Sequence, residues 1–269
     1  MEYLIQISLD IQYLNSITNS NASQAARALV LNVTSVFGAL TATRELVVPT
    51  IQKQYIVQNN TTGSYNSAFG VGALASNTTA SNNTAVGYQA GYSNTTGTNN
   101  TFSGYQAGYA GTTVSDNSFF GTSAGRYVTT GDNEAFGFVA LRGDNTGLCT
   151  GTGNSAFGNR ALIAVTSGSH NVGVGGSSMY NLTSGNYNVA VGENALQANT
   201  TASNNTAVGY QAGHSNTTGT QNAFFGYTAG YSSTGNYNTY LGSQTGSSAS
   251  TGSSNVGVGY NALNNPITG

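Results

Sequence analysis

The sequence predicts an all-β fold, a parallel β-solenoid of twelve coils of about 17 residues each. An Asn-x-x-apolar-Gly pattern, broken at its apolar position only by Ser103, recurs twelve times between Asn66 and Gly259. Charged residues make up only 5% of the 269-residue chain, whereas about 25% is typical of soluble proteins. Abundant Gly, Asn and β-branched residues disfavour helices. These features indicate short strands and corners, stacked coil on coil.

The repeat keeps a strict internal register. We count the repeat asparagine as position 0; Gly then stands at +4 in all twelve units and a small residue stands at +7. Of the eleven spacings between asparagines, eight are 17 residues, two are 16 and one is 21. Representative structural repeat residues are Asn66, Gly70, Asn83, Gly87, Asn100, Gly104, Asn154, Gly158, Asn188, Gly192, Asn205 and Gly209.

Each column of the repeat has an expected structural role. Position +3 is Phe, Val or Leu in eleven units, and we expect it to point inward as the core residue. Gly at +4 indicates a corner, where φ is positive or two backbones approach too closely for a Cβ. Position +8 is either Leu or Met, or Gly often followed by Tyr, which we interpret as one pocket filled in two ways. The asparagines should stack and bond to backbone and to one another.

The thin coil predicts a homotrimer. Each unit offers two runs of four or five residues between corners, which is strand length. Coils about 4.8 Å apart would form a rod of roughly 55 to 60 Å. Ordering the backbone costs roughly 1 to 2 kcal/mol per residue, which few apolar side chains offset. We expect other chains to cover the uncharged face that carries Tyr88, Tyr105, Tyr210, Tyr227 and Tyr260. A self-sufficient monomer is the alternative.

Residues 1–62 differ from the repeat domain, which we place at 63–269. Residues 3–13 alternate between apolar and polar, which predicts a half-buried strand. The run Ser23–Val30 predicts a short helix, and Leu46–Val57 predicts a strand interrupted at Pro49. We assign 1–62 to attachment or trimerisation; a cap over the first coil is the alternative.

Little in the sequence points to catalysis. His170 and His214, the only histidines, fall in repeat columns and are interpreted as column variants. The sparse carboxylates do not form the facing pair that a glycosidase needs. Cys149 is the only cysteine; we expect a small buried or loop thiol, with a contact between three copies as the alternative. We expect no enzymatic activity, no cofactor and no metal.

Charge and hydropathy exclude two kinds of partner. The net charge of −2 gives no bulk attraction to nucleic acid. No stretch reaches the 18 or more apolar residues of a membrane span. The start of the chain has an acidic residue where a secretory signal carries basic ones. We therefore expect neither nucleic-acid binding nor membrane insertion.

The one long spacing contains the run Arg142–Gly153. An insertion in a repeat array maps to a loop on one face, often a binding face. Arg142, Asp144 and Asn145 are therefore candidate ligand-loop residues. The alternative is an inert loop, with a surface ion pair among Asp132, Glu134, Asp144 and Arg142.

The repeats resemble a known type. Residues 83–91 read NTAVGYQAG, and 66–74 and 188–196 read NSAFGVGAL and NVAVGENAL. These runs are similar to the head repeats of trimeric autotransporter adhesins and to related repeats in bacteriophage tail fibres. The resemblance covers Asn66–Leu263 and implies left-handed parallel β-rolls, three chains to a head, that bind host or surface ligands. The period near 17 is longer than the usual adhesin-head repeat. Residues 40–58 are also similar to the stretch before the repeats in fibre proteins of marine phages.

The resemblance favours a structural virion protein. The sequence shows neither the secretion signal nor the membrane-anchor barrel of a secreted adhesin, so a phage tail fibre is preferred. We expect it to act on the virion outside the cell, to bind other virion proteins through its N-terminal segment, and to attach to a host cell-surface glycan or protein. Alternatives are a passive fibre shaft, a capsid decoration protein or a bacterial adhesin head. Ice binding, suggested by Thr-rich loops, is disfavoured because we expect those threonines to shift register.

Overall fold

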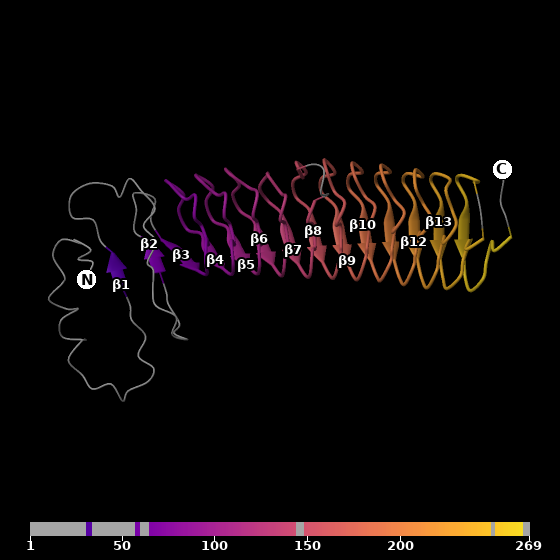
Figure 1. The fold of residues 1–269 in the computed structure, drawn as a ribbon. Coiled ribbons are helices and arrows are strands. Elements are labelled where there is room, and N and C mark those ends of the chain that lie inside the picture. Colours follow the sequence, from indigo (N-terminus) through magenta and orange to yellow (C-terminus); the bar gives the residue numbers. More distant parts are fainter. Residues whose placement is uncertain (1–30, 34–56, 60–64, 144–147, 249–250, 266–269) are drawn as a thin grey trace, which may run out of the picture.

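The computed structural model describes residues 31–33, 57–59, 65–143, 148–248 and 251–265. Within them the chain forms one 14-stranded sheet whose strands follow one another in sequence order, and no helix (Figure 1). The expected strand at 3–13, the expected helix at Ser23–Val30 and nearly all of Leu46–Val57 lie outside the described residues. The boundary at residue 62 does too.

The array is a parallel β-solenoid with one strand per coil, which confirms the predicted fold class. Equivalent repeat positions pair directly, as in Ala190 with Ala207. Before the array, β1 (Leu31–Val33) runs parallel to β2 (Val57–Asn59), and β2 runs antiparallel to β3. The strands of the array are β3 (Asn66–Phe69), β4 (Thr84–Val86), β5 (Thr101–Ser103), β6 (Ser118–Phe120), β7 (Glu134–Phe136), β8 (Ser155–Phe157), β9 (Val172–Val174), β10 (Val189–Val191), β11 (Thr206–Val208), β12 (Ala223–Phe225), β13 (Thr239–Leu241) and β14 (Val256–Val258).

The prediction of two strand runs per coil is wrong, because only positions +1 to +3 form a strand. In the second run the backbone φ is positive at +6 and +8, as in Gln89 (+52°) and Leu162 (+52°). An extended run cannot contain such residues. Neighbouring coils remain hydrogen-bonded there, since the Leu162 N–H donates to the Ser178 carbonyl at 3.0 Å. The second side of the coil is therefore a stack of turns.

The predicted core column is also wrong: position +2, and not +3, points into the coil. Ala85, Phe102 and Phe119 at +2 are fully buried, whereas Val86 and Phe157 at +3 are 43% and 38% exposed. Side chains alternate along a strand, so +2 shares the inward face with the buried asparagine at position 0. The larger apolar residues at +3 are consequently on the outside, and Ala fits the narrow interior.

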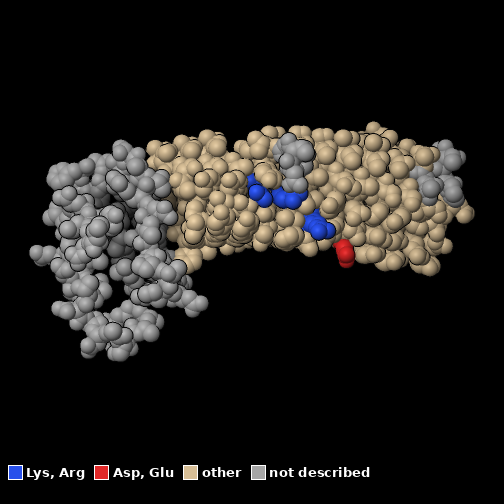
Figure 2. All heavy atoms as spheres, in the orientation of Figure 1, with Lys and Arg blue, Asp and Glu red and all other residues tan. Residues whose placement is uncertain are grey.

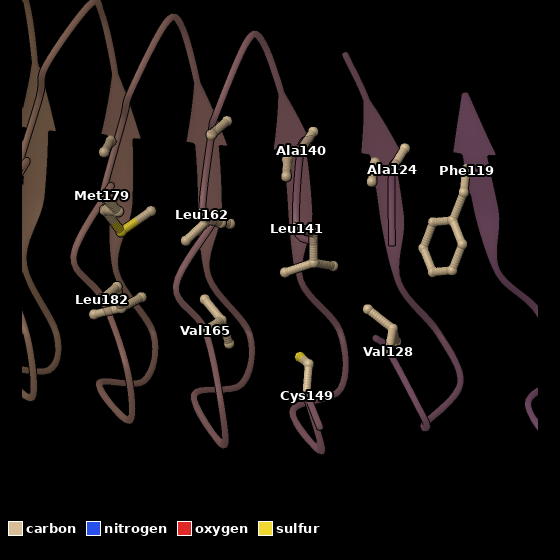
Figure 3. Close-up of a cluster of buried hydrophobic side chains, with 14 of the residues drawn as sticks. Phe119, Ala124, Val128, Ala140, Leu141, Cys149, Leu162, Val165, Met179 and Leu182 are labelled. Atoms are coloured by element: carbon tan, nitrogen blue, oxygen red, sulfur yellow. The ribbon is translucent and has the colours of Figure 1, made fainter. Parts of the chain in front are cut away.

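Positions +2 and +8 share one interior space, which is filled in two ways, although only one of the two fillers is the one expected. Leu141, Leu162 and Met179 at +8 fill it in the middle of the array (Figure 3). Where +2 is aromatic, +8 is Gly. A Cβ on Gly125 would lie 2.4 Å from the ring of Phe119, so the two fillers exclude each other.

The second filler is the aromatic residue at +2 and not, as expected, the tyrosine after the glycine. Tyr92 and Tyr109 lie half-buried at the surface and stack on each other, with ring centroids 5.3 Å apart. The buried aromatic residues at +2 are Phe102, Phe119, Phe224 and Tyr240.

The repeat asparagines form a continuous buried ladder, as expected. At each step the side-chain Oδ1 accepts the backbone N–H of the next repeat asparagine, as from Asn188 to Asn171 at 3.0 Å. In most coils it also accepts that asparagine's Nδ2–H, at 3.0 Å for this pair. Nδ2 donates as well to a corner carbonyl 14 residues on, as from Asn171 to Gly185 at 2.9 Å. One amide thus joins three points of the backbone across successive coils.

The glycines at +4 combine a positive φ with a close approach of two backbones, the two reasons expected for glycine at this corner. Gly158 has a φ of +142°, and a Cβ there would lie 2.5 Å from the carbonyl oxygen of Gly175 in the next coil. The same close approach recurs along the array until Gly259 in the last coil, where the Cβ direction is open. This column is the tightest contact between neighbouring backbones on that corner.

The threonines at +12 do not shift register, contrary to expectation. The Thr166 hydroxyl donates to the Thr183 carbonyl of the next coil at 3.1 Å, and Thr183 repeats the bond to Thr200 at 3.0 Å. The hydroxyl protons of Thr166 and Thr183 therefore bond to the neighbouring coil rather than point to solvent. The column consists of Thr78, Thr95, Thr112, Thr129, Thr150, Thr166, Thr183, Thr200, Thr217 and Thr234.

Candidate binding surface

Position +3 forms an exposed apolar column along the sheet. Because the strands are parallel and in register, the +3 side chains stack directly on one another. Phe136 lies between Phe120 and Phe157, with ring centroids 4.7 and 4.9 Å away. We call this set the outer column: Phe69, Val86, Phe120, Phe136, Phe157, Val174, Val191, Val208, Phe225, Leu241 and Val258.

A second exposed column stands beyond the glycine corner, at position +5. Tyr88 stacks on Tyr105 with ring centroids 5.3 Å apart, and Tyr210 stacks on Tyr227 at 5.5 Å. The tyrosine face expected from the sequence is therefore exposed. It lies beside the outer column, with only the +4 glycines between them.

The two columns expose more apolar surface than a monomer usually does. The eight most exposed members of the outer column each leave 37 to 66% of their surface accessible. With about 150 to 250 Å² per aromatic side chain, that column exposes on the order of 500 Å². The aromatic residues at +5 roughly double this area. A typical monomer has a largest patch of about 300 to 600 Å².

Charged side chains gather in the middle of the array. Among the described residues, the only Lys or Arg are Arg126, Arg142 and Arg160, in three consecutive coils. Lys and Arg atoms appear together on the face shown in Figure 2, with acidic atoms beside them. Arg126 stacks against the rings of Tyr109 and Tyr127, 5.6 and 5.1 Å from their centroids. We call these three residues the arginine patch.

The structure places only one of the three predicted ligand-loop residues. Arg142 is half-buried, and its Nε donates weakly to the neighbouring Gly143 carbonyl at 3.4 Å. Asp144 and Asn145 lie outside the described residues. The array regains its register at Cys149, which pairs with Val128. The extra residues of the long spacing therefore lie between Arg142, whose carbonyl accepts the Tyr127 N–H, and Cys149.

The expected ion pair near this loop does not involve Glu134. Its carboxylate accepts a hydrogen bond from the Ser155 hydroxyl at 2.7 Å, beside the asparagine ladder. Asp132 is exposed in the column that precedes each repeat asparagine. Asp132 and Glu134 are close to Arg142 in the sequence, but the repeat register places their side chains in other columns of the coil.

The two histidines are column variants, as interpreted from the sequence. His170 stacks on Tyr187 with ring centroids 5.1 Å apart, and His214 stacks on Tyr231 at 4.7 Å. Burial lowers the pKa of His214, because desolvation disfavours the charged imidazolium. Each ring replaces an aromatic neighbour in its stack.

Cys149 is buried among apolar side chains (Figure 3). Desolvation raises the pKa of its thiol to about 11, although a backbone hydrogen bond from Gly151 opposes the shift. The thiol is therefore inert at neutral pH. Its burial confirms the expected small buried thiol and leaves no sulfur for a contact between copies.

The described residues contain no group of three or more His, Cys, Asp or Glu side chains placed to hold a metal ion. Among them, no helix is long and apolar enough to cross a membrane.

Sequence reasoning missed the exposure of the outer column. The signal that could have found it is the parity of the strand. Asn at position 0 recurs in every unit, which indicates that its side chain has a fixed place inside the coil. Successive side chains of a strand point to opposite faces, so +2 shares the inward face with this asparagine and +3 falls on the outer face.

Comparisons of the chain with protein-family models, with curated proteins and with solved structures find no match.

Proposed function

We propose that the chain is a structural fibre or spike protein of a virion, of the phage tail-fibre type. It presents a left-handed β-solenoid as a homotrimer for attachment to a host surface and performs no catalysis. Its N-terminal segment joins it to other virion proteins. The observation that carries the proposal is the outer column, together with the resemblance of the repeats to fibre and adhesin heads.

The outer column favours association between copies. It is apolar along nearly its whole length and regular in spacing, so an identical column can pack against it coil for coil. The two columns together expose on the order of 1,000 Å², close to the roughly 800 Å² per partner of a standard interface. Three copies around one axis would cover the outer columns and extend the thin core of each coil.

Light scattering of the purified full chain tests the assembly. A particle of three times 27.4 kDa is expected. The variant F120E/F136E/F157E places three charges in the outer column and should give a monomer. The matched control T201E/T218E/T251E places the same charges on exposed threonines elsewhere and should remain a trimer. A monomeric wild-type chain would refute the trimer.

Binding of the labelled chain to cells of candidate host bacteria tests attachment. Saturable binding to one host, and not to others, supports the fibre that attaches. If antibodies against the array label virions but the chain binds no cell, the passive shaft or capsid decoration protein is favoured instead. Labelling of an uninfected bacterial surface would favour the adhesin head.

A further inference from the structure

We propose that the arginine patch binds the carboxylate groups of an acidic polysaccharide. This inference rests on the proposed function, because it names the class of host-surface ligand that the fibre would contact. The patch stands out in a rod with almost no charge. Its three cations occupy consecutive coils, and Lys and Arg atoms appear together on one face of the molecule (Figure 2).

The repeat register aligns two of the three cations in one column and places the third in the next coil. Arg126 and Arg142 share position +9, and the Tyr127 N–H beside Arg126 donates to the Arg142 carbonyl at 2.9 Å. Arg160 stands at +6 of the following coil. The Arg160 N–H donates to the Phe138 carbonyl at 3.0 Å. Coils lie about 4.8 Å apart, so positive charge recurs at about the interval of one coil. A polymer with one acidic group per sugar can follow such a row.

The described part of the chain leaves these cations without a carboxylate partner. Arg126 lies against Tyr109 and Tyr127, and its buried Nε has no hydrogen-bond partner. Arg160 is exposed and makes no ion pair with a described residue. The described carboxylates of the same coils, Asp132 and Glu134, stand beside the asparagine ladder in other columns. Apart from the acidic atoms beside the patch in Figure 2, the described surface around it is neutral, so little there competes with an acidic ligand.

The chemistry favours sugar carboxylates over nucleic acid. A guanidinium forms two parallel hydrogen bonds to a carboxylate, which gives geometric selectivity. The tyrosine rings beside Arg126 offer flat apolar faces of the kind that pack on sugar rings. Nucleic-acid binding draws most of its affinity from many Lys and Arg contacts to phosphates, and three arginines on a chain of net charge −2 supply few of them. Repetition in a trimer would strengthen weak contacts by avidity, about 10² to 10⁴-fold.

The test uses immobilised full-length chain and polygalacturonate, which carries one carboxylate per sugar. Saturable binding is expected, weakened by raising the salt concentration and absent with neutral dextran. The variant R126Q/R142Q/R160Q should bind at least tenfold more weakly, and exposed R160Q alone about two- to fivefold. The control T201E/T218E/T251E lowers the net charge by the same three units and should bind normally. Circular dichroism checks that each variant folds.

Three outcomes would overturn the inference. One is no binding of polygalacturonate by the wild-type chain. Another is equal loss of binding in the arginine variant and in the threonine control, which would mean a general charge effect. The third is equally tight binding of a single-stranded oligothymidylate, which would mean a site for any polyanion. None of these outcomes bears on the mass measured by light scattering or on binding to whole cells, so failure here is distinguishable from failure of the proposed fibre.

Discussion

Replacing Asn171 with Ala should break the solenoid near its middle. The substitution removes the bonds from Nδ2 to Asn154 Oδ1 (3.1 Å) and to the Gly185 carbonyl (2.9 Å). It also removes the two bonds that Oδ1 accepts from Asn188, both 3.0 Å. The buried N–H of Asn188 and the Gly185 carbonyl each lose a partner. At about 1 to 3 kcal/mol for each of these two unsatisfied buried groups, the loss is about 2 to 6 kcal/mol.

Urea unfolding followed by circular dichroism measures this loss. Asn181→Ala is the matched control, because Asn181 is exposed and its side chain makes no hydrogen bond within the described residues. Its cost should be within about 0.5 kcal/mol. Each coil contacts only its neighbours, so N171A should also broaden the transition as the two halves unfold separately. A loss for N171A within about 1 kcal/mol of the control would refute the argument that the ladder holds the coils together.

Three further predictions concern the corner, the interior and an aromatic stack. Gly158→Ala should lower the free energy of unfolding by several kcal/mol, because the new Cβ would lie 2.5 Å from the Gly175 carbonyl oxygen. Gly259→Ala places its Cβ in open space and should cost only about 1 kcal/mol. Thermal melts compare the two variants. Phe119→Ala should lower the free energy of unfolding by about 3 to 5 kcal/mol. Adding Gly125→Leu should recover part of this loss, because Leu141 and Leu162 adopt the same positive φ at the equivalent position. No recovery in the double variant would contradict the shared pocket. His214 has a lowered pKa, so the unfolded chain binds its proton more readily and stability should fall as the pH drops through about 6.5. His214→Tyr, which restores the ring found at Tyr231, should remove this part of the acid sensitivity; an unchanged pH dependence of the urea midpoint would show that another group is responsible.

The repeat predicted the coil but not which side of the strand faces inward. The asparagine ladder and the glycine corner follow from residue chemistry at fixed columns, because amide bonding and the absence of a Cβ are local properties. The inward face does not follow from hydrophobicity alone. Ala85 is buried and the larger Val86 is exposed, because the alternation of side chains along the strand decides which of them faces inward.

The candidate surface was predicted only in part for the same reason. The tyrosine column is exposed as expected, but the larger outer column beside it was assigned to the core. The arginine patch was seen only through Arg142, because sequence distance hides that Arg126 and Arg160 lie one coil to each side. Folding turns separations of 16 and 18 residues into neighbouring positions, and only the column register makes this visible.

The asparagine ladder has a consequence for how the molecule can change its length. Every coil offers the same acceptor to the next coil and uses the same donor toward the previous one, as Asn154, Asn171 and Asn188 do. A whole coil can therefore be removed or duplicated without leaving any bond of the ladder unmade. The length of the rod therefore changes in steps of about 4.8 Å, and the number of coils sets how far the molecule extends.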